Sequence, residues 1–460
     1  MATNTNLGGV FTTDIDSKST SNVFLSTENV VGLIFDTSIV GGLEKALGTE
    51  TEAAKAFANG NVVELNSSKD MKEAGIDEKV LEGVAKYHLD SFFNLAGGTQ
   101  RIFVSFMNSE DDTEFEAVEK MQLASGGIIY QIGVWTGKAI ATKKGDDTYA
   151  VDAGNICAKL ESVAEILGGK VGITNYEGNA PLNILLSAPI VNEAVVDLKK
   201  LPDLSGMDYP KVTVLVGQAP TDAVHKIMYD VNHAKEGMEE TKTFAPVGCV
   251  GAALGCLAVA PANESIAHVN GFNLAAVMQD AELGFGNIVE EEEPGSYKAE
   301  SSFTNIKTIG YTKRNDNLHK KGYVFLTNYD GLENSIFFSS DQTLSTGDYR
   351  TIARCRVMHK SRRVVRRALL PRVNSNVEID ATTGKLSASE IAEFQNIVIQ
   401  ALDMNMVEPG TSKPQISGRT CIIDENQDVL NTDAIDIHYS LVPLGVTSVI
   451  NVTEGFASTI

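Results

Sequence analysis

The sequence predicts a multidomain protein of mixed α/β and α+β class, and three observations support this. The chain has 460 residues, more than one ordinary hydrophobic core accommodates. Its composition, 43% apolar and 21% charged, is typical of a folded globular protein. Between about residues 60 and 245, strand-like and helix-like segments alternate, which favours a layered domain with largely parallel strands.

Most of these alternating strands and helices are predicted in the first half of the chain. Residues 1–25 are rich in Thr, Ser, Asn and Gly and predict an arm without a core of its own. Short apolar runs predict strands at 29–35, 100–107, 127–135, 182–190 and 211–216. Apolar residues at three- and four-residue spacing predict helices at 43–58, 113–124, 152–167, 192–201 and 221–240.

The pattern changes beyond residue 320, after an acidic stretch at 288–295 that is typical of a solvated linker. Strands are predicted at 322–328 and 336–338, followed by a strongly basic helix. A capping box from Ser387 to Glu390 then predicts the start of a second helix. Closing strands are expected at 419–423, 434–442 and 448–452.

Residues 244–262 contain no charge and raise the question of a membrane span. The segment includes two prolines and is built mostly of small residues, so its transfer into lipid is weakly favourable. Gly251 and Gly255 form a GxxxG pair, which serves close helix packing in lipid or in a protein interior. We expect a buried helix and no membrane insertion.

Searches for catalytic and cofactor motifs give no candidate. The sequence contains no phosphate-binding GxxxxGK[ST], no GxGxxG after a strand, no HExxH, no GxSxG and no paired-cysteine zinc spacing. Five scattered cysteines indicate reduced, buried thiols, and the N-terminal residues show no secretory signal pattern. We therefore expect no enzyme, no cofactor and no bound metal.

The segment from 350 to 372 contrasts with the rest of the chain. It holds nine Lys and Arg residues and no acid, whereas the whole chain carries a formal charge of -22. Projected on a helix, Arg356, Lys360, Arg363 and Arg367 fall in one narrow arc, with Ala and Val on the opposite side. Such an arc can be a solvated face, or it can bind an anionic partner because neighbouring like charges repel within a helix.

Two kinds of anionic partner fit this segment poorly. The acidic remainder of the chain repels nucleic acid. A membrane-surface helix usually has bulky apolar residues, which this one lacks. Its Ala- and Val-rich apolar side instead suits close packing inside a protein.

Several stretches together resemble the sheath subunits of contractile phage tails and related injection machines. They are residues 63–75 (VELNSSKDMKEAG), 91–105 (SFFNLAGGTQRIFVS), 247–255 (VGCVGAALG) and 260–271 (APANESIAHVNG). The C-terminal third matches best, at residues 348–365 (DYRTIARCRVMHKSRRVV), 384–391, 424–433 and 441–456. Residues 110–240 match only in layout, and the order of the motifs along the chain makes the resemblance specific.

The resemblance implies a conserved inner α+β sheath domain, built from N- and C-terminal segments, with an inserted outer α/β domain and terminal β-strand arms. The expected boundaries are an arm at 1–25, the N-terminal part of the core at 26–95, the outer region at 96–320, the inner domain at 321–440, and a C-terminal strand or arm at 441–460. The inter-subunit strand is expected at Ser448, Val449, Ile450, Asn451 and Val452, by β-augmentation.

The resemblance also implies a function and a set of partners. The chain would polymerise helically around an inner tail tube and contract to drive the tube through a target envelope, without nucleotide hydrolysis. Expected partners are other copies of the chain, the tube protein, and baseplate and tail terminator proteins, but no nucleic acid. The particle would assemble in the bacterial host cytoplasm and act as a virion tail or extracellular injection particle.

The resemblance makes the arc of Arg356, Lys360, Arg363 and Arg367 a candidate contact face, either for the tube or for the next subunit. Two alternatives stand beside the sheath interpretation. An α/β enzyme with an unrecognised site would show activity on metabolites, and a nucleic-acid module would show salt-sensitive DNA binding.

Overall fold

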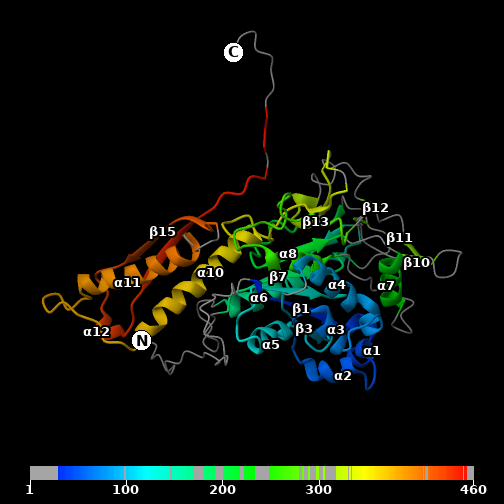
Figure 1. Ribbon diagram of the computed structural model, residues 1–460, viewed down its shortest axis with the longest axis horizontal. Coiled ribbons are helices and arrows are strands. Elements are labelled where there is room, and N and C mark those ends of the chain that lie inside the picture. The colour runs from blue at the N-terminus through cyan, green and yellow to red at the C-terminus, as the bar shows by residue number, and fades with distance from the viewer. Residues whose placement is uncertain are drawn as a thin grey trace, which may run out of the picture. The chain divides into compact units, whose positions relative to one another are not determined.

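The structure is a computed structural model with two compact units, residues 1–363 and 364–460 (Figure 1). It describes residues 29–97, 100–145, 148–168, 180–191, 200–217, 222–233, 248–278, 318–329, 331–332, 334–407, 409, 413–448 and 450–452, and four short strands between residues 282 and 305. The predicted arm at 1–25 and all but the last two residues of the predicted helix at 192–201 lie outside these residues.

An eight-stranded sheet organises the large unit, in the order β14-β13-β8-β7-β4-β1-β3-β2. Its strands are β1 (Val31–Asp36), β2 (Val63–Leu65), β3 (Ile102–Met107), β4 (Gln131–Trp135), β7 (Asn183–Ser187), β8 (Val212–Val216), β13 (Tyr323–Thr327) and β14 (Phe337–Phe338). The six inner strands pair in parallel, and only the edge strands β2 and β14 are antiparallel. The predicted parallel sheet is confirmed.

Helices cover both faces of this sheet, so its inner strands are buried throughout. Two glycines show which helix covers which face. A Cβ at Gly32 would meet the Met121 sulfur of α5 (Glu116–Ala124), whereas a Cβ at Gly133 would meet Val250 of α8 (Val250–Val259) and the side chain of Leu33. Because Gly32 and Leu33 are adjacent in one strand, α5 and α8 lie on opposite faces.

Within the uncharged segment, Val250–Val259 forms α8, which is packed inside the large unit against α4 (Val84–Ala96). A Cβ at Gly251 would lie 2.0 Å from the carbonyl oxygen of His88, and one at Gly255 would lie 3.0 Å from that of Phe92. The GxxxG pair therefore permits close contact between two helices of the same unit, as predicted. No helix in the described part of the chain has the length and hydropathy of a membrane span.

The other α-helices that the structure describes in the large unit are α1 (Leu43–Leu47), α2 (Glu52–Ala56), α3 (Ser68–Glu73), α6 (Ile156–Leu167), α7 (Asp222–His233) and the first turns of α10 (Ile352–Leu369). Short 3-10 turns lie at Ser38–Val40, Ala58–Gly60 and Val80–Gly83. The single helix predicted at 43–58 is wrong. Gly48 has a φ of 80° and ends α1, and the Thr51 side chain caps α2.

Minor strand pairs complete this unit. They are β5 (Thr142–Lys143) with β6 (Tyr149–Ala150), β9 (Glu282–Leu283) with β12 (Thr304–Asn305), and β10 (Ile288–Glu290) with β11 (Tyr297–Ala299). Because β10 begins inside the acidic stretch, the prediction of a solvated linker is wrong for residues 288–290.

The small unit contains the last turns of α10, η7 (Leu370–Arg372), α11 (Ala388–Leu402), η8 (Asp403–Val407), β15 (Ile416–Ile423), α12 (Val429–Thr432) and β16 (Ile437–Pro443). α11 packs on the antiparallel β15–β16 pair, and its buried residues are Glu390, Phe394, Val398 and Leu402. As predicted, Ser387 caps α11 by accepting a hydrogen bond from the Glu390 amide at 3.2 Å.

The division between the units falls inside α10, whereas the resemblance led us to expect a boundary near residue 320. The segments expected to be separate domains also share one sheet. Of the strands in this sheet, β1 and β2 come from the predicted N-terminal core. The strands β3, β4, β7 and β8 come from the predicted outer region, and β13 and β14 come from the predicted inner domain. The domain boundaries in an assembled sheath remain a prediction.

Candidate interaction surfaces and the basic helix

Arg356 of α10 is fully buried in the large unit, with 0% of its surface exposed. Its guanidinium donates hydrogen bonds to the carbonyls of Leu257 at 3.1 Å, Ala260 at 2.9 Å and Pro261 at 3.2 Å. These carbonyls lie at the C-terminal end of α8, where helical carbonyls lack helical partners and the helix dipole is negative. Arg356 therefore compensates the end of the buried GxxxG helix.

Arg363, two turns further along α10, makes a similar set of contacts. It donates to the carbonyls of Ile128 at 3.1 Å, Ile129 at 2.8 Å and Pro181 at 2.8 Å. Its guanidinium also lies 3.9 Å from the centre of the Tyr130 ring, a cation–π geometry. The acceptors immediately precede β4 and β7, so Arg363 binds the amino ends of two central strands.

The structure corrects the prediction that four cationic residues form one exposed arc. Arg356 is buried and Arg363 is half-buried in backbone contacts, whereas Lys360 is half-buried and Arg367 is exposed. Arg362, which lies beside the arc, is exposed and donates to the Gly168 carbonyl at the end of α6. The helical projection places these side chains correctly around the axis, but it cannot identify the carbonyls that cover them.

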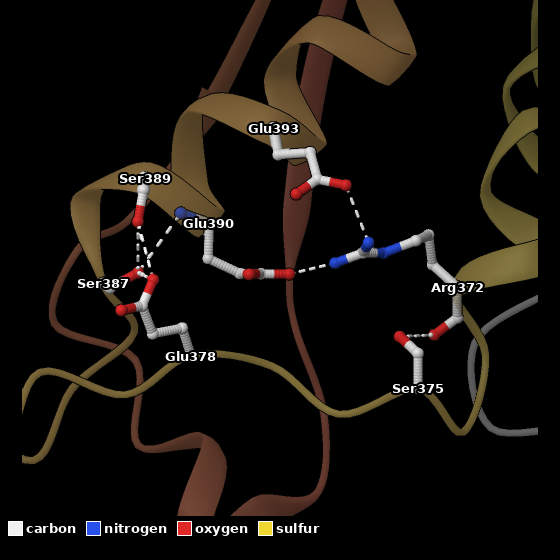
Figure 2. A network of polar contacts seen from close by, with 7 residues as sticks. All are labelled: Arg372, Ser375, Glu378, Ser387, Ser389, Glu390 and Glu393. Carbon is white, nitrogen blue, oxygen red and sulfur yellow. Dashed lines mark hydrogen bonds and ion pairs between the residues drawn. The ribbon is translucent and has the colours of Figure 1, made fainter.

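A second cationic contact lies within the small unit. Arg372, at the end of η7, forms ion pairs with Glu390 and Glu393 of α11, as Figure 2 shows. Its guanidinium also lies 4.9 Å from the centre of the Phe394 ring. Arg372 therefore fastens the end of the basic segment to the first turns of α11.

The same network ties the loop before α11 to the helix start. Glu378 accepts hydrogen bonds from Ser387 at 3.3 Å and Ser389 at 2.9 Å (Figure 2). The Glu390 carboxylate, which in a capping box turns back to its own helix end, instead binds Arg372. These contacts brace the basic segment and α11 against each other.

Large apolar side chains are unusually exposed in the small unit. Among the residues that the structure describes, four are exposed in the large unit and eight in the small one. The eight are Val373, Met404, Ile422, Leu430, Val442, Val446, Ile450 and Val452. Since the small unit is also the shorter one, it exposes large apolar side chains more densely than the large unit does.

Strand edges occur in the same unit. β15 and β16 pair only with each other in the described part of the chain, so each has one edge with free backbone groups. Ile422 on β15 and Val442 on β16 lie on this two-stranded sheet and are exposed. A two-stranded sheet is marginal alone and gains stability from added strands.

The predicted inter-subunit strand has no strand partner within the described chain. Ser448, Ile450, Asn451 and Val452 have no regular secondary structure and are exposed, Ile450 by 78% and Val452 by 76%. Val449 and residues 453–460 lie outside the described residues. Apolar Ile450 and Val452 flank polar Asn451, so in a strand these two apolar side chains would share one face.

In doubly wound sheets, ligands usually bind at the carboxyl edge, where the strand order reverses. In this chain, polar side chains at that position bind one another. This position lies at the carboxyl ends of β1 and β4, whose onward connections run in opposite directions. There the buried Asp36 carboxylate accepts hydrogen bonds from the Ser38 amide, the Ser109 amide and hydroxyl, and the Thr136 hydroxyl, over 2.5–3.0 Å. The carboxylate thus fastens three strand ends together.

The described residues contain neither a cluster suited to a metal ion nor a fully exposed cysteine. No group of three or more His, Cys, Asp or Glu side chains suited to a metal ion occurs within the described ranges. Four of the five cysteines are buried, and burial raises the pKa of the Cys249 thiol to about 12 and that of Cys355 to about 11. These two thiols are therefore protonated and unreactive at neutral pH.

Comparisons with known proteins agree with the fold. The family model described as "DUF2586, C-terminal domain" matches residues 348–460, which includes α10 and the whole small unit. No curated protein sequence matches the chain.

Among the solved structures that match are two that do so over nearly their full length. The helical sheath of the anti-feeding prophage (AFP) in its contracted state superposes with a TM-score of 0.54 at 14% identity, covering 99% of this chain and 100% of that one. A chain of the AFP baseplate gives 0.52 at 12% identity, covering 98% and 99%. The chain therefore has the mixed α/β fold of a contractile sheath protein, which confirms the resemblance seen in the sequence at the level of the fold.

Proposed function

We propose that this protein is the structural subunit of a contractile sheath, which polymerises helically around an inner tube and shortens to drive that tube through a target envelope. The concentration of exposed apolar residues in the small unit carries the proposal, because contact with neighbouring copies would remove these side chains from water. The full-length likeness to the AFP helical sheath supports it, since that protein is a helical polymer.

In this proposal the two-stranded sheet β15–β16 is the joint between subunits. Its open edges accept extended segments from neighbouring copies, and residues 448–452 are the donor strand. Backbone hydrogen bonds supply the affinity, while Ile450 and Val452 bury their side chains on the acceptor. The N-terminal residues 1–25 are proposed as a second donor on the basis of their sequence.

In this proposal the protein works by assembling into a polymer and does not act as an enzyme. Its proposed partners are other copies of itself, the tail tube protein, the baseplate and the tail terminator, and its place is a virion tail or an extracellular injection particle built in the host cytoplasm. The energy for movement is stored in the extended polymer. The filled ligand position at Asp36 fits a fold used as a structural body.

In the basic helix we restrict the proposed contact surface to the part that is exposed in the structure. Arg367 is the exposed member of the predicted arc and is the proposed contact with the tube or with the next subunit. Exposed charge pairs contribute about 0–1 kcal/mol each, which suits contacts that form in numbers and release together. Sheath made with Arg367→Glu that still encloses tube normally would exclude this residue as the tube contact.

The joint can be tested with paired charge substitutions on the arm. We expect Ile450→Asp with Val452→Asp to abolish pelleting of polymer on ultracentrifugation and tubes in negative-stain micrographs, because a carboxylate cannot be buried on the acceptor. The folded chain should keep its melting temperature, since both side chains are exposed.

A matched control is Leu123→Asp with Val269→Asp, which changes two exposed apolar residues of the large unit. This control should polymerise as the unaltered chain does. Equal polymerisation by the arm variant would refute the role of residues 448–452.

A further inference from the structure

The basic segment is fastened at its beginning by contacts inside the large unit. Arg356 and Arg363 together donate six hydrogen bonds to backbone carbonyls, and Arg362 adds one to Gly168. The acceptors belong to the ends of α8 and α6 and to the segments that lead into β4 and β7. The first turns of α10 are thus tied to two covering helices and to the centre of the sheet.

The same segment is fastened at its end by contacts inside the small unit. Arg372 binds two glutamates of α11 and covers the Phe394 ring, with its own side chain largely buried. Both sets of contacts join a charged guanidinium to oxygen acceptors, the stronger class of hydrogen bond. They are also formed by arginine, whose planar fork binds several acceptors at once.

Between these two ends α10 is continuous and has no weak point of its own. It contains neither glycine nor proline from Ile352 to Leu369, and Pro371 follows only after its last turn. The chain crosses from the large unit to the small unit once, between Arg363 and Val364. α10 is therefore the covalent connection through which tension between the units passes.

We propose that residues 352–372 form a mechanical link, a continuous helix that is anchored by Arg356 and Arg363 at one end and by Arg372 at the other. Under tension the guanidinium contacts prevent α10 from peeling away from the sheet. The basic character of the segment is then explained by internal anchoring. Its use during contraction depends on the proposed sheath function, whereas the anchoring itself is a property of the single chain.

The anchor is best tested by pulling on isolated chains. Cysteines placed at two exposed positions, Leu123→Cys and Val373→Cys, provide attachment points on either side of it, with Cys421→Ser removing the accessible native thiol. At constant force, release of α10 is recorded as the extension gained when the helix leaves the large unit. This geometry applies tension to the Arg356 and Arg363 contacts without passing through α11.

We expect Arg363→Met to shorten the lifetime of the attached state roughly tenfold or more, because three carbonyls lose their charged donor. Arg363→Lys keeps the charge but lacks the fork, so an intermediate lifetime is expected. Arg367→Met is the matched control, since it removes an exposed arginine one turn away and should leave the lifetime unchanged. Equal lifetimes for Arg363→Met and Arg367→Met would overturn the proposal.

Hydrogen exchange supplies a second measurement that needs no force and tolerates a destabilised variant. In Arg363→Lys the amides of residues 352–363 should exchange faster than in the unaltered chain, while those of residues 388–402 should be unchanged. Uniform acceleration over both ranges would show a general loss of stability and no anchor. Both measurements use monomers. A chain that forms no tubes can therefore still show the anchor, and the two proposals can fail separately.

Discussion

Glu161 is a buried carboxyl group near the beginning of α10, where three segments of the large unit meet. One carboxylate oxygen accepts a hydrogen bond from the Lys211 amide at 2.7 Å, and the other has no hydrogen-bond partner among the described residues. Burial raises the pKa of Glu161 from 4.5 to about 7, and the Lys211 amide and charge only partly oppose this. The group is therefore largely protonated in the folded chain at slightly acidic pH.

This raised pKa predicts that Glu161 costs stability as pH rises. The unfolded chain ionises near pH 4.5 while the folded chain keeps its proton, so stability is fully present below 4.5 and is lost up to about pH 7. Glu161→Gln should remove this loss, and the free-energy difference between the two proteins should change by on the order of 3 kcal/mol across that window. Urea unfolding at several pH values measures it.

His359 lies beside Lys211, close to Glu161, and its titration changes the stability of the chain in the opposite direction. Burial and the charges of Lys211, Arg363, Arg362 and Arg356 lower the pKa of His359, so its contribution is lost on acidification. This contribution is common to both proteins and cancels in the difference. Parallel stability curves for the unaltered chain and Glu161→Gln between pH 4.5 and 7 would contradict the assignment.

At the scale of elements, the contact between α4 and α8 depends on Gly251. A methyl group there would lie 2.0 Å from a backbone oxygen, which cannot move aside without shifting α4. Gly251→Ala should lower the free energy of unfolding by about 1–3 kcal/mol through this overpacking, despite alanine's better helix propensity. Thermal or urea denaturation followed by circular dichroism measures the loss.

A second glycine serves as the control for this prediction. Gly154 precedes α6, has open space where a methyl group would lie and needs no left-handed backbone, so Gly154→Ala should leave stability within about 0.5 kcal/mol. If Gly251→Ala were equally neutral, close packing would not be the reason for the GxxxG pair.

Most elements could be predicted from the sequence because their signals are local. The strands β1, β3 and β8 are mostly apolar, and the capping box at Ser387 marks the start of α11. The roles of Arg356 and Arg363 could not be predicted, because their acceptors lie between 95 and 235 residues away in the chain. A helical projection shows where a side chain points and gives no information on backbone carbonyls from distant segments.

The helix break within 43–58 and the strand at 288–290 could not be predicted for a different reason. Periodicity continues through Gly48, and only its backbone angle shows that the helix ends there. The charge of the run at 288–295 favours a linker, whereas Ile288 and Val289 pair with Ala299 and Lys298 further along the chain. Pairing partners override composition in such short segments.

At the scale of the whole molecule, the two units differ in ways that fit the proposed sheath subunit. The large unit is a sheet buried on both faces, with its carboxyl-edge ligand position filled by its own side chains. The small unit has a limited core and displays apolar residues and open strand edges. Open strand edges and exposed apolar side chains are what the proposed strand exchange between neighbouring copies would need.

Electron microscopy of the purified, unaltered protein tests the sheath proposal most directly. At micromolar concentration we expect hollow helical tubes in negative stain, with neighbouring copies joined through β15–β16. A preparation that remains dispersed as single particles at every concentration and salt condition tested, while the chain is folded, would contradict the proposal.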